Sequence, residues 1–421
     1  MSNINSNWAL ACHFDFGGQG TLGVLKPGTD AFLNLTADNA SGQEHAPWFL
    51  GITADDKVIM LDQVSKEITL TDKMPRDAYP AYCYTDKSSG RVWFMNDGDK
   101  NTGNDTLNCG NNGASVTIVA PANNGSAPIH VATLCVGRGH HVPTFVGPDS
   151  TNPERKKLAF LSNLLDGTIN VINNDDTDQE NFLKIIHTID LVETEKEKDG
   201  TTAWPNNAFP HGKQYSEVTG KIYSLNNGYG TIAVINPDTF EIESRINLKG
   251  ASNLLLSPCG KYIIGKGADR KSDAEHVVGK ISIVDVQSQE VLSINDVPDF
   301  YPSVYRFSPD KSKLFVTSAA TGKDVQKDNL KINTLYVYDA SKLPELSLIK
   351  VMEVGESDCG RRPLAFPADS GIKLMFNPNP SEGTVNIIDS EKLEIINTLE
   401  LAGPGAKEFN FSLWEQAIYG A

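Results

Sequence analysis

The most regular feature of the chain is a short run of alternating or continuous apolar, β-branched residues that ends at a turn residue, usually Asp or Asn. Seven such runs recur: KVIMLD (57–62), SVTIVAP (115–121), TINVINN (168–174), TIAVINP (231–237), KISIVDV (280–286), TLYVYDA (334–340) and TVNIIDS (384–390). Apolar alternation with β-branched enrichment predicts strands rather than helices. The Asn and Asp residues that end the runs predict turns, because their side chains bond their own backbone two residues on.

The seven runs start 49 to 63 residues apart, and this spacing indicates one supersecondary unit repeated along the chain. Further strand patterns lie between them. One follows each turn, another lies near a proline, as in SVYRFSPDK, and a third comes next, as in SKLFVTSAA. Four antiparallel strands in a unit of about 50 residues predict one blade of a β-propeller.

Residues 1–421 are therefore expected to form a single all-β propeller domain. Seven units are clear, and the chain ends supply pieces of an eighth. The C-terminal KEFNFSL (407–413) and QAIYG (416–420) read as the first two strands of a blade, and the N-terminal WALACHFD (8–15) and TLGVLKP (21–27) as its last two. Pairing both ends in one blade would close the ring and remove open sheet edges. Eight blades are favoured, with seven as the alternative.

Three segments share a strand ending in Asn followed by a Gly-Thr-led strand that ends in Ile-Asn or Ile-Asp: FLSNLLDGTINVIN (160–173), YSLNNGYGTIAVIN (223–236) and MFNPNPSEGTVNIID (375–389). This pattern resembles the YVTN-type propeller repeat, as do the hairpins SPCGKYI and SPDKSKLFV. The resemblance covers most of the chain and implies a propeller fold. Related propellers occur in surface-layer proteins, quinoprotein dehydrogenase subunits, nitrous-oxide reductase and haem-containing nitrite reductase, so the resemblance leaves the activity open.

Charge and composition limit the classes of partner that the protein is expected to bind. A net charge of −16 argues against nucleic acid and anionic membrane surfaces, and leaves small molecules, metal cations or a protein partner. No run of about 18 apolar residues predicts a membrane span. The N-terminus lacks the basic and apolar regions of a signal peptide, so the chain is either cytosolic or a mature exported form. A periplasmic or otherwise exported location is favoured. The six cysteines are scattered without a C-x-x-C pair, which argues against thioredoxin-type chemistry.

In a propeller the loops that enter the innermost strands converge on one mouth of the central channel, and convergent polar groups make this mouth the expected ligand site. The residues predicted to enter these strands are Tyr79, His140, His141, His211, Ser252, Asn253, Tyr301, Arg361, Arg362, Lys407 and Glu408. Their imidazole, phenol, guanidinium and ammonium groups predict a locally basic mouth that is competent to bind a metal.

The strongest metal signal combines GRGHHVPTF (137–145) with FPHGK (209–213), which occupy equivalent positions in adjacent units. His140 or His141 is therefore expected to face His211. Neutral imidazoles are common ligands of copper, iron and zinc; copper or iron is favoured and zinc is the alternative. The competing interpretation is that these histidines hydrogen-bond the backbone at strand entries. His13 and His45 would join the set only if the N-terminal blade closes as expected.

Arg361 and Arg362 suggest an anion site, because guanidinium groups bind carboxylate and phosphate in a bidentate manner. Together with Tyr301 they are the predicted catalytic residues, and Lys407 and Asn253 are the predicted contacts to a cofactor. Such a set would suit a substrate carboxylate or a tetrapyrrole propionate. The alternative is a solvated arginine pair bonded to a carboxylate of a neighbouring blade.

A second metal signal is the D-x-D-x-N spacing of Asp97, Asp99 and Asn101, which suits calcium. A plain polar loop is the alternative there.

Two functions of different classes follow. The first is an exported propeller that binds a metal ion or redox cofactor at its channel mouth and acts as an oxidoreductase. The second is a non-enzymatic propeller that binds a ligand or protein partner, since one fold can host many functions. The sequence contains no G-x-S-x-G elbow to support nucleophilic catalysis.

Overall fold

The computed structural model describes residues 10–15, 20–25, 48–52, 57–62, 68–73, 80–96, 109, 113–120, 129–139, 142–198, 200, 204–355, 364, 366, 373–379, 382 and 384–400. These residues form 28 strands, one 3-10 helix, η2 (Thr194–Lys196), and one four-residue helix, α1 (Asp324–Lys327). The all-β prediction is confirmed. Within this part of the chain no helix is long and apolar enough to cross a membrane.

The strands form eight antiparallel sheets, and the first three along the chain are listed here. They consist of β1 (Leu10–Asp15) and β2 (Gly20–Leu25); β3 (Trp48–Ile52), β4 (Lys57–Asp62) and β5 (Ile68–Lys73); and β6 (Pro80–Thr85), β7 (Val92–Asn96), β8 (Ala114–Ala120) and β9 (Ile129–Val136).

The next two sheets have four strands each and flank the residues of most interest. They consist of β10 (Pro143–Val146), β11 (Leu158–Asn163), β12 (Thr168–Asn173) and β13 (Ile185–Asp190), and of β14 (Pro210–Ser216), β15 (Lys221–Asn226), β16 (Thr231–Ile235) and β17 (Ile242–Asn247).

Three further sheets complete the described part of the chain. They consist of β18 (Ala251–Leu256), β19 (Tyr262–Asp269), β20 (Val278–Asp285) and β21 (Val291–Pro298); β22 (Pro302–Phe307), β23 (Lys313–Ser318), β24 (Thr334–Asp339) and β25 (Ser347–Glu353); and β26 (Leu374–Asn379), β27 (Thr384–Asp389) and β28 (Glu394–Glu400).

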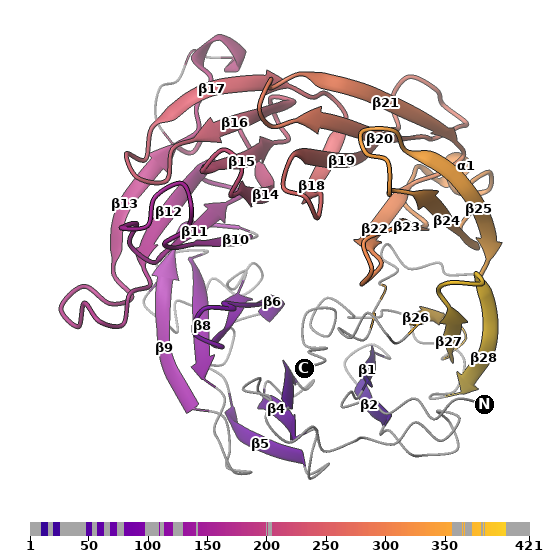
Figure 1. The fold of residues 1–421 in the computed structure, drawn as a ribbon, viewed down its shortest axis with the longest axis horizontal. Helices are drawn as coiled ribbons and strands as arrows, with labels where there is room; N and C mark the ends of the chain where they lie inside the picture. The colour runs from indigo at the N-terminus through magenta and orange to yellow at the C-terminus, as the bar shows by residue number, and fades with distance from the viewer. Residues whose placement is uncertain are drawn as a thin grey trace.

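The sheets stand in a ring, and in each four-stranded sheet the first strand lies nearest the centre and the last at the rim (Figure 1). This is the arrangement of a β-propeller. Each of the seven predicted runs forms the next-to-last strand of its sheet, from β4 to β27, which confirms the repeat. β1 pairs with β2 as expected. The C-terminal runs 407–413 and 416–420 lie outside the described residues, so closure of the ring and the count of eight blades stay predictions.

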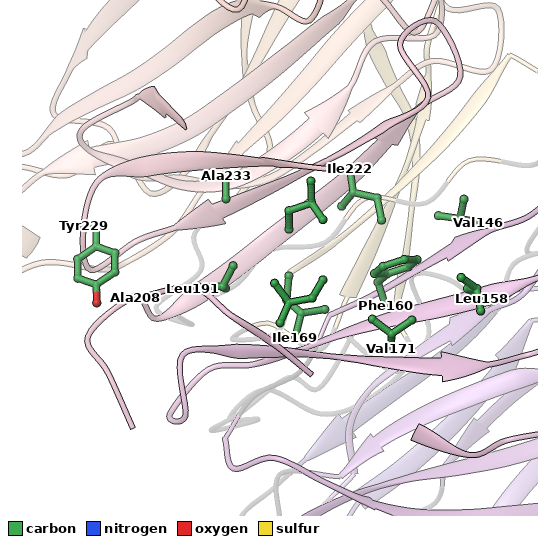
Figure 2. Packing of buried hydrophobic residues seen from close by; sticks show 12 residues of the cluster. Val146, Leu158, Phe160, Ile169, Val171, Leu191, Ala208, Ile222, Tyr229 and Ala233 are labelled. Atoms are coloured by element: carbon green, nitrogen blue, oxygen red, sulfur yellow. The ribbon is translucent and has the colours of Figure 1, made fainter. Parts of the chain in front are cut away.

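The core lies between neighbouring sheets. Successive side chains of one strand point to opposite faces of its sheet, and each face packs against a different neighbouring sheet. Phe160 and Ile169 of the β10–β13 sheet pack against Ile222 and Ala233 of the β14–β17 sheet, and all four are fully buried (Figure 2). Tyr223, one residue after Ile222, belongs instead to the core shared with the β18–β21 sheet. Burial on both faces explains why the inner strands read as continuous apolar runs.

The connections between strands lie on two opposite faces of the ring. We call the face at which the first strand of each four-stranded sheet begins the entry face. Because the strands alternate in direction, this face also carries the loops from second to third strands and the connectors between sheets. In the described residues the entry face holds the segments 270–277 and 319–333. The opposite face holds short turns such as 217–220 and 308–312 together with two longer connections, 147–157 and 174–184.

On the opposite face a buried ion-pair cluster ties the β10–β13 sheet to the β14–β17 sheet. Arg155, which is 5% exposed, donates to Asp149 Oδ2 at 2.9 Å and to Asp238 Oδ1 at 2.8 Å, and its guanidinium also contacts the Tyr215 hydroxyl. Burial alone would raise the pKa of Asp149, but hydrogen bonds from Thr151 and Tyr215 outweigh it and lower this pKa to about 2. Asp149 therefore stays ionised beside Arg155.

Candidate functional site

Four of the first strands begin at a proline, as the sequence pattern predicts for entries to the innermost strands. These are Pro80 in β6, Pro143 in β10, Pro210 in β14 and Pro302 in β22. Proline lacks an N–H and has a fixed φ, so it suits the first residue of a strand. His211 and Tyr301, the predicted site residues next to these prolines that the structure describes, therefore lie on the entry face, at the inner rim of the ring.

The start of β14 is bulged. Its pairing with β15 shifts between Pro210, which pairs with Asn226, and Lys213, which pairs with Ser224, and this leaves one extra residue in β14. Such bulges redirect side chains. Gly212 has a φ of +91°, and a Cβ at this position would lie 2.5 Å from Asn253 Oδ1. Only glycine fits here, because the backbone is left-handed and the neighbouring inner strand is too close for a side chain.

The bulge holds His211 against the next sheet. Its Nδ1 lies 2.8 Å from the carbonyl oxygen of Ser252, at the start of β18. A carbonyl only accepts, so Nδ1 donates, and in the neutral imidazole Nε2 then carries the lone pair. This is the arrangement in which a backbone carbonyl fixes the tautomer and orientation of a metal-binding histidine.

Lys213, two residues later, reaches toward the preceding sheet. Its Nζ donates to the carbonyl oxygen of Val142 at 2.8 Å, just before β10, and the residue is 3% exposed. Burial lowers the pKa of Lys213 well below its usual value. The sequence prediction missed this residue, because the local sequence PHGKQYS gives no sign that its lysine is buried.

The structure brings Asn253 next to His211, because Gly212 packs against the Asn253 side chain. The Asn253 Oδ1 accepts a hydrogen bond from the Leu254 N–H at 2.7 Å. Tyr301 lies one sheet further on, directly before β22, and its ring is covered by the guanidinium of Arg270 at 5.6 Å. Arg270 belongs to the β19–β20 loop of the entry face and is a second cation that the sequence prediction missed.

A third cation, Lys266, lies in β19 between these positions. Its Nζ donates to the carbonyl oxygens of Pro302 and Ser303 at the start of β22, and it sits 5.4 Å from the Tyr305 ring centroid. Lys213, Lys266 and Arg270 thus add basic side chains to two consecutive sheets, β14–β17 and β18–β21.

Several predicted site residues belong to segments that the structure does not describe. His140, His141, Arg361, Arg362, Lys407, Tyr79, Glu408 and the Asp97, Asp99 and Asn101 loop lie outside the described residues, as do His45 and the side chain of His13. Among the residues that the structure does describe, no group of three or more His, Cys, Asp or Glu is arranged to hold a metal ion. The histidine set at the mouth and the calcium loop both stay predictions.

The connector from β13 to β14 is anchored by two buried glutamates. Glu193 pairs with Lys196 at 2.8 Å and Arg245 at 3.3 Å, and Glu197 accepts hydrogen bonds from the Tyr229 hydroxyl and from Asn207. The bond from Tyr229 is the main cause of the lowered pKa of Glu197. This charged segment contains the 3-10 helix η2.

Beyond these anchors the connector exposes two aromatic side chains, Trp204 at 53% and Phe209 at 37%. Phe209 directly precedes Pro210, so an apolar surface lies beside the start of β14. Exposed aromatic residues next to a polar site are typical of a binding surface.

A disulfide joins Cys109, before β8, to Cys135 in β9, with the two Cα atoms 5.1 Å apart. It links the β7–β8 loop of the entry face to the outermost strand of the same sheet. Cys259, in the β18–β19 turn of the opposite face, is exposed and carries a free thiol.

No protein-family model matches the chain, and no curated protein matches it in sequence. Solved structures do match. Dihydro-heme d1 dehydrogenase NirN in complex with DHE aligns with a TM-score of 0.56 at 13% identity, over 90% of this chain and 67% of that one. The hydrazine synthase of Kuenenia stuttgartiensis aligns with a TM-score of 0.52 at 14% identity, over 83% and 94% of the two chains.

A putative 6-phosphogluconolactonase from Bacteroides uniformis aligns with a TM-score of 0.51 at 12% identity, over 85% of this chain and 97% of that one. The neighbours are β-propeller proteins of diverse function, and at these identities the similarity shows the fold alone. The propeller part of the predicted resemblance is confirmed. The YVTN family itself is not shown and stays a resemblance in sequence.

Proposed function

We propose that the propeller binds a metal ion or a metal-containing redox cofactor at the inner rim of the entry face, with His211 as a ligand, and acts as an oxidoreductase. The observation that carries this proposal is the Nδ1 hydrogen bond from His211 to Ser252, which directs the lone pair to Nε2. Copper or iron is the favoured metal, because both accept imidazole ligands, and zinc is the alternative. His140 and His141, from the adjacent sequence unit, are the proposed further ligands.

The other roles follow from charge and position. Tyr301, Arg361 and Arg362 are the proposed catalytic contacts to an anionic substrate, and Asn253 and Lys407 the proposed contacts to the cofactor. The contact between Arg270 and the Tyr301 ring supports an anionic substrate, because the guanidinium brings a positive charge to this phenol. When bound, the metal centre would supply electron transfer or Lewis-acid polarisation.

Elemental analysis tests the proposal. The purified protein, reconstituted in turn with copper, iron and zinc salts and then desalted, is expected to retain about one metal ion per chain, because imidazole sites of this kind survive gel filtration. His211→Ala is expected to lose that metal. The matched control is His130→Ala, which removes an exposed histidine of the outer strand β9 and should leave the metal content unchanged.

Wild-type protein that retains none of the three metals would exclude a metal at this site. Metal that survives in His211→Ala would place the site elsewhere in the chain.

A second candidate function is binding of a protein or organic ligand without catalysis. It is favoured by one observation, the exposed Trp204 and Phe209 beside the start of β14. This function predicts that a Trp204→Ala, Phe209→Ala double variant loses its partner while the metal content is unaffected.

We propose an exported, oxidising location for the protein, supported by the Cys109–Cys135 disulfide, because such bonds persist mainly outside the reducing cytosol. Protein isolated from its native source with alkylation before lysis is expected to yield a Cys109–Cys135 cross-linked peptide and an alkylated Cys259. Alkylation of Cys109 and Cys135 in the native protein would instead indicate a reducing compartment.

A further inference from the structure

One buried position distinguishes the β14–β17 sheet from its neighbours. We compare one position of the first strand in the four sheets from β10 to β25. The first residue of each of these strands has a partner on the second strand, and the position compared is the one that pairs with the residue two places before that partner. It is Phe145 in β10, Leu254 in β18 and Tyr305 in β22, and all three face the preceding sheet. In β14 the same position holds Lys213, which also reaches the preceding sheet. A cation therefore replaces an apolar or aromatic side chain at this interface.

The surroundings of Lys213 are polar as well. Its cross-strand partner is Ser224, and Asn226 follows two residues later on the same side of β15. Both are fully buried. Thr144 lies on the other side of the interface and is 8% exposed. It pairs with Phe160, which belongs to the core between these two sheets, so Thr144 faces the same interface. This set of four residues, Lys213, Ser224, Asn226 and Thr144, forms a polar layer at the inner edge of an interface that is otherwise apolar.

Most of these polar groups lack a protein partner. The Ser224 hydroxyl, the Thr144 hydroxyl and both amide atoms of Asn226 make no hydrogen bond to the part of the chain that the structure describes. A buried polar group without a partner costs about 1–3 kcal/mol. Several such groups on facing strands therefore point to a bound species that is not protein.

The chemistry of the polar layer favours an anion. An ammonium, two hydroxyls and an amide NH2 are hydrogen-bond donors, and the Lys213 ammonium donates one of its three bonds to Val142. Within the described residues Lys213 has no carboxylate partner. Glu193 lies in the neighbourhood, because it accepts a hydrogen bond from Thr231, which pairs with Asn226. Its charge is already paired with Lys196 and Arg245. Burial without a counter-charge disfavours the ammonium form, in agreement with the lowered pKa of Lys213, and an anion in this layer would supply that counter-charge.

We propose that the interface between β10–β11 and β14–β15 binds one small monovalent anion of halide size, held by Lys213, Ser224, Asn226 and Thr144. The anion must be small because Phe160, Ile222 and Ala233 pack the adjoining layer of the same interface. This site is independent of the proposed metal ligand, because His211 is directed to the opposite neighbour, at Ser252. The anion would join the two sheets next to the channel, because it would supply the negative charge that pairs with Lys213.

Thermal unfolding of the full chain tests the proposal, with chloride as the probe. At constant ionic strength the wild-type Tm is expected to rise by several degrees when sodium chloride replaces sodium gluconate, and the rise should saturate with chloride concentration. Lys213→Met is expected to lose this difference. Lys266→Met is the matched control, because Lys266 also donates to carbonyl oxygens of a neighbouring sheet, and it should keep the wild-type response.

An equal chloride response in wild type and Lys213→Met, or no response in wild type, overturns the proposal. If Lys213→Met does not fold, Ser224→Ala serves in its place and should weaken the apparent chloride affinity several-fold. Crystals of the wild type grown in bromide supply a direct readout. An anomalous peak within hydrogen-bond distance of Lys213 Nζ is expected, and its absence would show that water alone occupies the layer.

Discussion

Phe160→Ala is expected to lower the free energy of unfolding by about 3–5 kcal/mol, the usual range for removing a buried phenylalanine side chain. Phe160 is fully buried at the centre of the core between the β10–β13 and β14–β17 sheets, next to Ile169 and Ile222 (Figure 2). The cavity cannot collapse easily, because both walls are sheets held by their own hydrogen bonds. Urea denaturation at neutral pH, analysed by linear extrapolation, measures the change.

The control for this variant is Leu165→Ala in the turn between β11 and β12, where the side chain is 44% exposed. We expect it to change the free energy of unfolding by less than about 1 kcal/mol, because little apolar surface is lost from the core. A small effect of Phe160→Ala, comparable to that control, would mean that the two sheets do not share a packed core.

Arg155→Met is expected to destabilise the protein by about 3–5 kcal/mol, because it leaves the Asp149 carboxylate, which is 9% exposed, without its cation. Asp149, with its pKa lowered to about 2, would stay charged at neutral pH beside an apolar side chain. Asp238 would lose its partner at the same time. The same urea experiment at pH 7 measures the loss.

The comparison for Arg155 is an exposed ion pair. Lys280 and Asp296 are joined at 2.8 Å, with side chains 23% and 57% exposed, and Lys280→Met is expected to cost no more than about 1 kcal/mol. Equal losses in the two variants would show that the Arg155 cluster is solvated.

Acid should also weaken the wild-type cluster. A carboxylate whose pKa is lower in the folded state stabilises the fold above its unfolded pKa of about 3.9, and this contribution disappears as the pH falls toward about 2.

The repeat and the strand entries could be predicted from sequence because they depend on local chemistry. Runs such as TINVIN and TIAVI carry their β preference and their turn residues within a few positions, and they form β12 and β16. Pro210 marks the start of β14 for an equally local reason, the lack of an N–H, so His211 was placed correctly at the inner rim.

The groups that the prediction missed depend on contacts between distant segments. Arg155 and Asp238 are 83 residues apart, and Lys213 meets Val142 across 71 residues. No local pattern distinguishes Lys213, buried between two sheets, from a solvated lysine on an edge strand. The bulge at Gly212 is likewise set by the close approach of β18, which is a property of the assembled ring.

The loops of the entry face have a consequence for how such a protein can diversify. The segments 270–277 and 319–333 leave and rejoin strands whose side chains are already committed to the cores between sheets. Exposed residues exchanged there, such as Val325, alter the rim around the channel without repacking those cores. The entry face is therefore the natural place to graft a foreign recognition loop, and a lineage could acquire a new ligand there while its scaffold stays the same.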